Sequence, residues 1–292
     1  MKTVKDLPSL RALVREARAS GKSIGLVPTM GALHEGHLSL ARLARKECGF
    51  TVVSIFVNPL QFAPGEDFER YPRREADDAA VLGTAGADVL YLPDAKAFYP
   101  PDFSTAIEVA GVSEGGEGAA RPGHFRGVAT VVAKLFLQVQ PDAAFFGRKD
   151  LQQVAVIRRM TLDLDFPIRI EVGPTVREPD GLALSSRNAY LSSDERRRAA
   201  GLSAALFAAR RRAAAGERDV ARLENETRRE IEAAGLAVES IEVVLPDTME
   251  RPPRIGPGAA LCAAVRVGKT RLIDNVLLLD AETAEREDSG KP

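Results

Sequence analysis

The pair His34 and His37, in the run His-Glu-Gly-His, is the part of this sequence best suited to chemistry. The apolar run 24–27 before it predicts a strand and the residues after it predict a helix, so both imidazoles share a face of its first turn. A helix N-terminus offers unpaired N–H groups and the positive end of the helix dipole. Gly31 and Gly36 let a ligand approach the backbone. Together these groups predict a site for an anion such as a phosphate.

Two further runs carry groups that suit phosphates. Gly-Arg-Lys-Asp at 147–150 follows another predicted strand, where Lys149 would neutralise phosphate charge. Ser-Ser-Arg-Asn at 185–188 joins two hydroxyls to a guanidinium, which suits the outer phosphates of a nucleotide. Simpler interpretations stay open: a solvated charge cluster for the first run, a helix cap or turn for the second, and a structural role for each histidine, including His124.

Amides and carboxylates extend the candidate site. Asn58, Gln61 and Gln153 follow predicted strands and could bind a hydroxyl and a carboxylate without fixing a protonation state, although each could equally bond its own turn. The pair Asp77-Asp78 could hold Mg²⁺ through one carboxylate, or could be the solvated first turn of a helix. The candidate site therefore combines phosphate-binding groups, neutral amides and one metal contact.

The elements that position these residues alternate along the chain. Strands are predicted at 24–27, 50–57, 88–92, 142–146 and 168–172, and helices at 7–20, 37–48, 75–86, 127–140 and 149–165. Such alternation predicts an α/β fold, a Rossmann-like, doubly wound parallel sheet covered by helices on both faces. In such folds ligands bind at the carboxyl ends of the strands, where the candidate residues fall.

The pattern changes near residue 193. Two helices dense in Ala and Arg are predicted at 194–214 and 219–234, and strands at 241–245, 261–267 and 271–279. We therefore predict three parts of the chain: a nucleotide-binding domain over 1–176, a smaller α+β C-terminal domain over 177–280, and a polar, disordered tail over 281–292.

Composition and charge limit the class of protein. Lys and Arg number 40 against 41 Asp and Glu, and the formal net charge of −1 disfavours a strongly basic nucleic-acid-binding protein. Cys48 and Cys262 form no zinc pattern and fit a reducing compartment. There is neither a signal-peptide pattern nor an apolar run of membrane-spanning length. We expect a cytoplasmic protein that binds neither membrane nor nucleic acid.

Five runs in chain order carry a resemblance to a known family. They are VPTMGALHEGH (27–37), FVNPLQF (56–62), RPGHF (121–125), FGRKDLQQ (146–153) and TVREPDGLALSSRN (175–188). On these runs the sequence resembles the pantoate–β-alanine ligase family, from the first helix to about Leu279. The resemblance implies condensation of pantoate with β-alanine, driven by ATP through a pantoyl-adenylate, to give pantothenate, AMP and pyrophosphate. It also implies Mg²⁺, a lid-like C-terminal domain and a homodimer.

The resemblance also implies roles for single residues. His37 would be the catalytic histidine, with His34 and Lys149 stabilising the α-phosphoryl charge, and Asp77 would contact Mg²⁺. The substrate contacts implied are Gln61, Gln153, Asn58, Arg121 and His124, of which Gln61 would also adjoin β-alanine. The ATP contacts implied are Met30, Gly31, Ala32, Leu33, His34, Glu35, Gly36, His37, Gly147, Arg148, Lys149, Asp150, Val176, Leu184, Ser185, Ser186 and Arg187.

Three residues depart from the usual family pattern: Arg148 replaces Glu, Pro179 replaces Ala and Leu184 replaces Met. None removes a proposed catalytic group. The nearest alternative is another adenylyl-transfer enzyme of the same fold, such as a nucleotidylyltransferase or an aminoacyl-tRNA synthetase-like protein, but the amides favour a small hydroxy acid as acceptor. A non-enzymatic alternative is RNA binding by the Arg-rich helices at 194–230, which the acidic residues between the arginines disfavour.

Overall fold

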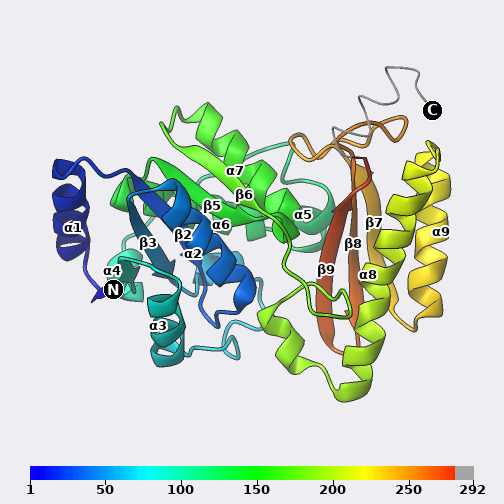
Figure 1. The fold of residues 1–292 in the computed structure, drawn as a ribbon, viewed down its shortest axis with the longest axis horizontal. Helices are drawn as coiled ribbons and strands as arrows, with labels where there is room; N and C mark the ends of the chain where they lie inside the picture. Colours follow the sequence, from blue (N-terminus) through cyan, green and yellow to red (C-terminus); the bar gives the residue numbers. More distant parts are fainter. Residues whose placement is uncertain (280–292) are drawn as a thin grey trace. The chain divides into compact units, whose positions relative to one another are not determined.

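A computed structural model describes residues 1–279, which form two units (Figure 1). The first unit comprises residues 1–148 and 156–174, and the second comprises 149–155 and the chain from 175. The predicted tail at 281–292 lies outside the described residues.

A six-stranded parallel sheet forms the centre of the first unit. Its strands are β1 (Lys2–Val4), β2 (Ile24–Thr29), β3 (Phe50–Ile55), β4 (Val89–Tyr91), β5 (Ala143–Gly147) and β6 (Arg169–Gly173). They lie in the order β1-β4-β3-β2-β5-β6. The chain runs outward from β2 to β4 in one direction and from β5 to β6 in the other, so the order reverses between β2 and β5. This confirms the predicted doubly wound sheet. In sheets of this kind ligands bind where the strand order reverses, which here is at the ends of β2 and β5.

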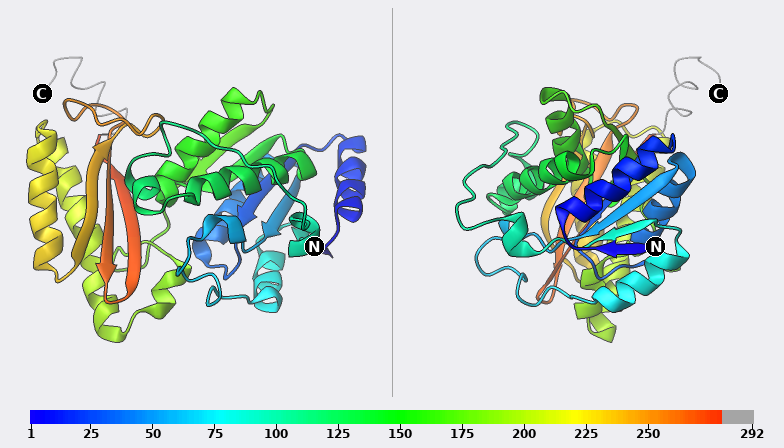
Figure 2. Two further views of the ribbon diagram at one scale, coloured as in Figure 1. Left: turned by 180° about the vertical axis from the view of Figure 1, so that it is seen from behind. Right: turned by 90° about the vertical axis from the view of Figure 1, so that its left-hand side faces the viewer.

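Helices cover both faces of this sheet. The longer ones are α1 (Leu7–Ala19), α2 (Glu35–Glu47), α3 (Glu75–Thr84), α6 (His124–Val139) and α7 (Leu151–Asp163), and two short ones are α4 (Ala95–Phe98) and α5 (Gly116–Ala120). Figure 1 shows α2 in front of the strands, and Figure 2, seen from behind, shows α6 on the opposite face. Leu40 and Ala44 of α2 pack with Leu82 of α3 and Phe145 of β5 in one apolar core. Burial of these side chains fixes the two loops that follow β2 and β3.

Several element boundaries differ from the prediction. Strand β1 was not predicted, because three residues carry no clear pattern; it exists by pairing with β4. Strand β2 continues through Pro28 to Thr29, which is tolerated because β5 pairs only with Gly25 and Leu26 of this strand. Helix α2 begins before His37, and helix α6 begins before Gly127. Both early starts bring a predicted site histidine into the first turn of a helix.

The second unit is a three-stranded antiparallel sheet with two helices. Strands β7 (Ala237–Val244), β8 (Ala260–Val267) and β9 (Thr270–Leu277) pair in that order. Helices α8 (Ser193–Ala214) and α9 (Val220–Ala233) pack together on this sheet (Figure 1). The predicted smaller α+β domain is confirmed.

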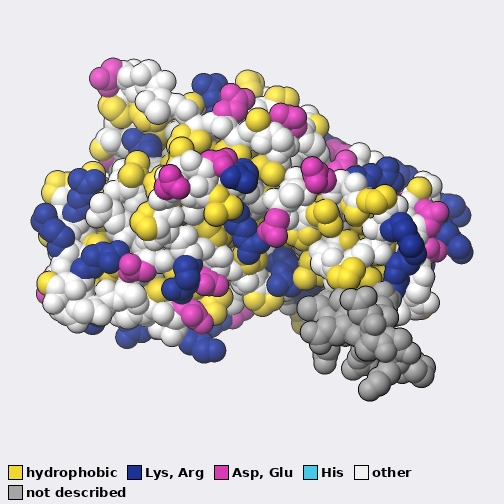
Figure 3. Space-filling model, turned by 90° about the horizontal axis from the view of Figure 1, so that it is seen from above, with side chains coloured by type: hydrophobic (Ala, Val, Ile, Leu, Met, Phe, Trp, Pro, Cys, Tyr) yellow, Lys and Arg dark blue, Asp and Glu magenta, His cyan; other side chains and the backbone are white. Residues whose placement is uncertain are grey.

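The arginines of α8 and α9 form ion pairs with neighbouring acids. Arg212 pairs with Glu226 and Glu230, and Arg222 pairs with Glu217 and Glu226. Figure 3 shows basic and acidic side chains mixed on the surface that it presents. These pairs support a solvated helical surface over the RNA-binding alternative. Within residues 1–279, no helix combines the length and apolar character that a membrane crossing needs.

Candidate active site

Two histidines cap the N-terminus of α2. His34 is the N-cap, and its Nδ1 accepts a hydrogen bond from the Gly36 N–H at 3.2 Å. The Nδ1 of His37, the third residue of the helix, accepts from the His34 N–H at 3.3 Å. This reciprocal arrangement is a capping box in which imidazoles replace the usual Ser and Glu side chains. The first turn is therefore fixed by the two residues predicted to do chemistry.

The same bonds determine where each imidazole carries its proton. A backbone N–H can only donate, so the Nδ1 atoms of His34 and His37 are unprotonated, and the proton of each neutral ring lies on Nε2. The two ring centroids lie 4.1 Å apart. The helix start thus presents two adjacent Nε2–H donors beside the positive end of its dipole, an arrangement suited to phosphate oxygens.

Asp78 holds the loop between β2 and α2. Its buried carboxylate accepts from the N–H of Ala32 at 2.9 Å and from the N–H of Leu33 at 2.8 Å. Ala32 has a φ of 50°, in the left-handed region that is unfavourable for residues with a Cβ. Burial raises the pKa of Asp78 above its usual value, although the two backbone bonds oppose this. The carboxylate therefore keeps the predicted phosphate loop in a conformation that the loop would not adopt alone.

Of the pair Asp77-Asp78, the resemblance implies Asp77 as the Mg²⁺ contact, and the structure gives Asp78 a separate role. Asp77 is exposed in the first turn of α3, whereas both oxygens of Asp78 bond the loop. Helical spacing could have separated the two, since Asp78 lies four residues before the buried Leu82. Among the residues that the structure describes, no three His, Cys, Asp or Glu side chains gather as metal ligands. A lone exposed carboxylate fits Mg²⁺ that arrives on phosphates rather than a resident ion.

Gln61 connects the loops that follow β2 and β3. It ends the short 3₁₀ helix η1 (Pro59–Gln61), which is separated from β3 by three residues. Its amide Nε2 lies 3.0 Å from Sδ of Met30, the first residue of the predicted phosphate loop. The predicted substrate amide and the predicted nucleotide loop are therefore in contact, as expected for the carboxyl ends of two paired parallel strands.

Arg121 and His124 bind the backbone of Gln61. The Arg121 guanidinium makes two bonds to Glu66, at 2.7 and 2.6 Å, and its Nη1 lies 3.1 Å from His124 Nε2. His124 Nδ1 lies 2.8 Å from the Gln61 carbonyl oxygen. Since a guanidinium only donates and a carbonyl only accepts, His124 carries its proton on Nδ1. Although burial raises the pKa of Glu66, its bonds to Arg121 hold that pKa below its usual value.

His124 gives the fold a pH dependence that can be tested. Burial and the Arg121 guanidinium lower the pKa of His124 to about 4, so protonation favours the unfolded chain. The stability that comes from a neutral His124 is fully present above pH ~6.5, the pKa of histidine in an unfolded chain. It is lost as the pH falls from there towards the lower pKa of His124 in the folded protein. We expect the free energy of unfolding to fall by about 1–2 kcal/mol more between pH 7.5 and 5 in the wild type than in His124→Asn.

Urea denaturation at the two pH values measures this difference. The Asn side chain can still donate to the Gln61 carbonyl, and the other two histidines are common to both proteins. Equal pH slopes in the two proteins would show that His124 is not held neutral by its surroundings.

The remaining predicted residues lie around the end of β5 and in the second unit. Gly147 ends β5, and Arg148, Lys149 and Asp150 form the 3₁₀ helix η2. The Lys149 Nζ lies 4.0 Å from Asp150 Oδ1, and Asn275 of β9 donates to the Lys149 carbonyl at 2.9 Å. Gln153 is half-buried in the first turn of α7. The backbone of Lys149 is therefore fixed to β9 of the second unit by the Asn275 side chain.

The segment 175–188 folds against β9. Leu184 donates its N–H to the Val176 carbonyl at 3.0 Å, and Ser185 accepts from the Arg187 N–H at 3.3 Å as the cap of η3 (Ser186–Tyr190). The segment is fixed by two bonds from Arg177 to the buried Asp274, at 2.6 and 3.0 Å. Sequence reasoning missed Arg177 and Asp274 because their pairing spans 97 residues.

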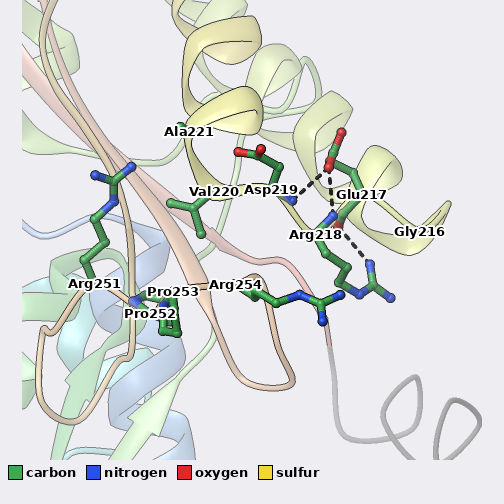
Figure 4. Close-up of a pocket in the computed structure, with 10 residues that line it drawn as sticks. All are labelled: Gly216, Glu217, Arg218, Asp219, Val220, Ala221, Arg251, Pro252, Pro253 and Arg254. Atoms are coloured by element: carbon green, nitrogen blue, oxygen red, sulfur yellow. Dashed lines mark hydrogen bonds between the residues drawn. The ribbon is translucent and has the colours of Figure 1, made fainter.

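A groove of about 750 Å³ in the second unit contains none of the predicted residues (Figure 4). It is lined by Gly216, Glu217, Arg218, Asp219, Val220, Ala221, Arg251, Pro252, Pro253 and Arg254. The Glu217 carboxylate accepts from the N–H groups of Arg218 and Asp219, both at 2.8 Å, and Arg251 pairs with Glu224 at 2.6 Å. Glu217 and Arg251 are therefore already bonded within the protein, and none of the residues predicted for the site lines this groove.

A doubly wound sheet whose reversal point carries a histidine-capped helix is the architecture of a nucleotide-binding α/β enzyme. Residues 2–277 match the model of one protein family, described as "Pantoate-beta-alanine ligase". The chain therefore belongs to the pantoate–β-alanine ligase family.

Individual relatives agree with this assignment. The chain is 52% identical to pantothenate synthetase 1 of Bradyrhizobium diazoefficiens over 281 residues, which cover 95% of this chain and 98% of the relative. Its fold matches the crystal structure of pantothenate synthetase from Thermus thermophilus with a TM-score of 0.91 and 47% identity, covering 96% of this chain and 100% of the other. A pantoate–β-alanine ligase from Francisella tularensis, solved in complex with β,γ-ATP and β-alanine, matches with a TM-score of 0.79 and 34% identity, over 95% and 98% of the two chains.

Proposed function

We propose that this chain condenses pantoate with β-alanine at the expense of ATP, through a pantoyl-adenylate. The observation that carries the proposal is the pair of Nε2–H donors at the start of α2, directly after β2, in a member of this ligase family. The β,γ-ATP and β-alanine in the complex of the Francisella relative support the choice of substrates.

In the first step the pantoate carboxylate attacks the α-phosphorus of ATP, and pyrophosphate leaves. Negative charge builds on the α-phosphoryl oxygens during this step. We assign its stabilisation to His37 and His34, which offer Nε2–H donors, and to Lys149, which offers a positive charge. We propose that the remaining contacts to ATP are made by Met30 to Gly36, Gly147, Arg148, Asp150, Val176, and Leu184 to Arg187.

In the second step the neutral amine of β-alanine attacks the acyl carbon of the adenylate, and AMP leaves as the amide forms. We propose that Gln61 and Gln153 hold the pantoyl part by hydrogen bonds. Arg121 and His124 contribute by fixing the Gln61 backbone. A C-terminal domain over 177–280 that acts as a lid would keep water from the adenylate.

Mg²⁺ would enter with ATP, with Asp77 as its protein contact, and would neutralise charge on the triphosphate when bound. We also propose a cytoplasmic homodimer. Sedimentation of the purified chain at assay concentration tests the dimer, which a mass near the 31.4 kDa of one chain would contradict.

A product assay tests the reaction. With ATP, Mg²⁺, pantoate and β-alanine we expect pantothenate, AMP and pyrophosphate in equal amounts, and no AMP after chelation of Mg²⁺. Omission of β-alanine should leave at most one AMP-equivalent per site, held as the adenylate. Equal turnover with unrelated carboxylic acids would exclude the substrate assignment. Sustained pyrophosphate release without any amine would favour the alternative of another adenylyl-transfer enzyme.

A further inference from the structure

Asn58 has used its entire hydrogen-bonding capacity inside the protein. The residue is only 1% exposed. Its Nδ2 donates to the Gly127 carbonyl at 3.0 Å and to Gln61 Oε1 at 3.1 Å, and its Oδ1 accepts from the Leu60 N–H at 3.3 Å and from the Tyr99 hydroxyl at 3.0 Å. A side-chain amide has two N–H groups and two oxygen lone pairs. Asn58 therefore has no group left to offer a ligand.

The orientation of the Asn58 amide is fixed by two backbone groups. The Gly127 carbonyl can only accept, so Nδ2 must face it, and the Leu60 N–H can only donate, so Oδ1 must face it. The Tyr99 hydroxyl must then act as the donor to Oδ1. Burial raises the pKa of Tyr99 well above its usual value, so this hydroxyl keeps its proton. The direction of every bond in the chain Tyr99–Asn58–Gln61 follows from these constraints.

The fixed Asn58 amide determines which end of Gln61 is presented to a ligand. Because Asn58 donates to Oε1, the Gln61 Nε2 points the other way, towards Met30 Sδ at 3.0 Å. A thioether sulfur is a weak acceptor, so a ligand oxygen can replace it at little cost. The backbone of Gln61 cannot turn to compensate, since His124 and Arg121 bond its carbonyl.

We propose that Tyr99 and Asn58 are positioning residues that fix the Gln61 amide with its N–H groups towards the ligand, so that the site selects an acid with an acceptor oxygen at this point. Asn58 then acts through Gln61, and not as the direct substrate contact that the sequence analysis gave. The identity of the acid as pantoate rests on the proposed function. The orientation of the Gln61 amide, with its N–H groups towards the ligand, rests on the hydrogen bonds alone.

The variant Tyr99→Phe tests the positioning, with Tyr91→Phe as its matched control. Tyr91 is also buried and also donates to an amide oxygen, that of Gln138, at 2.9 Å. We expect Tyr99→Phe to raise the KM for pantoate roughly 5- to 10-fold, the effect of one hydrogen bond, with KM for ATP and kcat within twofold of the wild type. Tyr91→Phe should leave all three constants unchanged. Equal effects of the two variants, or a change in kcat alone, would overturn the positioning role.

Two measurements separate this inference from the proposed function. In the ligand-free protein, labelled with ¹⁵N on Asn and Gln side chains, Tyr99→Phe should shift the amide signals of Asn58 and Gln61, and Tyr91→Phe should shift that of Gln138. Unshifted Asn58 and Gln61 signals would overturn the inference whatever the substrate is. A wild-type protein that does not use pantoate would overturn the proposed function and leave this result standing.

The variant Gln61→Glu tests whether Gln61 presents a hydrogen-bond donor to the ligand. Its carboxylate can still accept from Asn58 but offers no donor to an acidic ligand. We expect calorimetry to show pantoate affinity reduced more than 30-fold, with ATP affinity retained. Wild-type pantoate affinity in Gln61→Glu would show that Gln61 presents an acceptor, and the inference would be wrong.

Discussion

The variant His37→Ala is expected to form pantoyl-adenylate about 10²–10³-fold more slowly than the wild type, the usual loss when one charge-stabilising donor is removed. The Nε2–H of His37 would bond an oxygen whose negative charge grows in the transition state, so the loss falls on the rate more than on ATP affinity. Single-turnover formation of the adenylate, with the ATP dissociation constant measured separately, checks this result.

His37 also has a structural role, which a second variant separates. Its Nδ1 accepts the His34 N–H, so His37→Ala should also lower the free energy of unfolding, by about 0.5–1 kcal/mol. In His37→Asn the side-chain oxygen can accept that N–H, but no donor remains at the position of Nε2. We expect His37→Asn to regain the stability and not the rate. A His37→Ala protein that melts early yet adenylates at the wild-type rate would limit His37 to capping, and the charge stabilisation would pass to His34 and Lys149.

The variant Gly127→Ala is expected to lower the free energy of unfolding by about 2–3 kcal/mol, the cost of overpacking a core. A Cβ on Gly127 would lie 2.2 Å from the Leu60 carbonyl oxygen and 2.6 Å from the Gln61 nitrogen. Both atoms belong to the backbone of η1, so no side-chain rotation can relieve the contact. If α6 and η1 separate instead, Gln61 moves, and pantoate affinity should fall at least 10-fold.

The variant Gly83→Ala is the matched control. Gly83 also lies in a helix, α3, but apart from its chain neighbours and the backbone of its own helix no atom lies within 4 Å of the position of its Cβ. Higher helix propensity should therefore stabilise Gly83→Ala by about 0.5–1 kcal/mol. Urea denaturation and pantoate calorimetry of both variants give the comparison. Normal stability together with normal pantoate affinity in Gly127→Ala would show that α6 and η1 are not in the close contact described.

The sequence by itself determined the parts that depend on neighbours in the chain. The alternation of apolar strands and helices predicted the doubly wound sheet and the smaller α+β domain, because each element follows a local period. The run from His34 to His37 predicted a helix N-terminus with two imidazoles on one turn. Its capping bonds join residues two or three positions apart, so local geometry suffices to form them.

Only the tertiary structure decided which distant side chains fix the predicted loops of each unit. Asp78 bonds a loop 46 residues before it, Glu66 pairs with Arg121 over 55 residues, and Arg177 pairs with Asp274 over 97. Whether a carboxylate or amide bonds a ligand or the protein depends on burial and on partners that packing brings together. Helical spacing places Asp78 on the buried face of α3, but the sequence could show neither that Asp78 bonds the loop before α2 nor that Asn58 is fully bonded, since these outcomes are set when distant segments pack side by side.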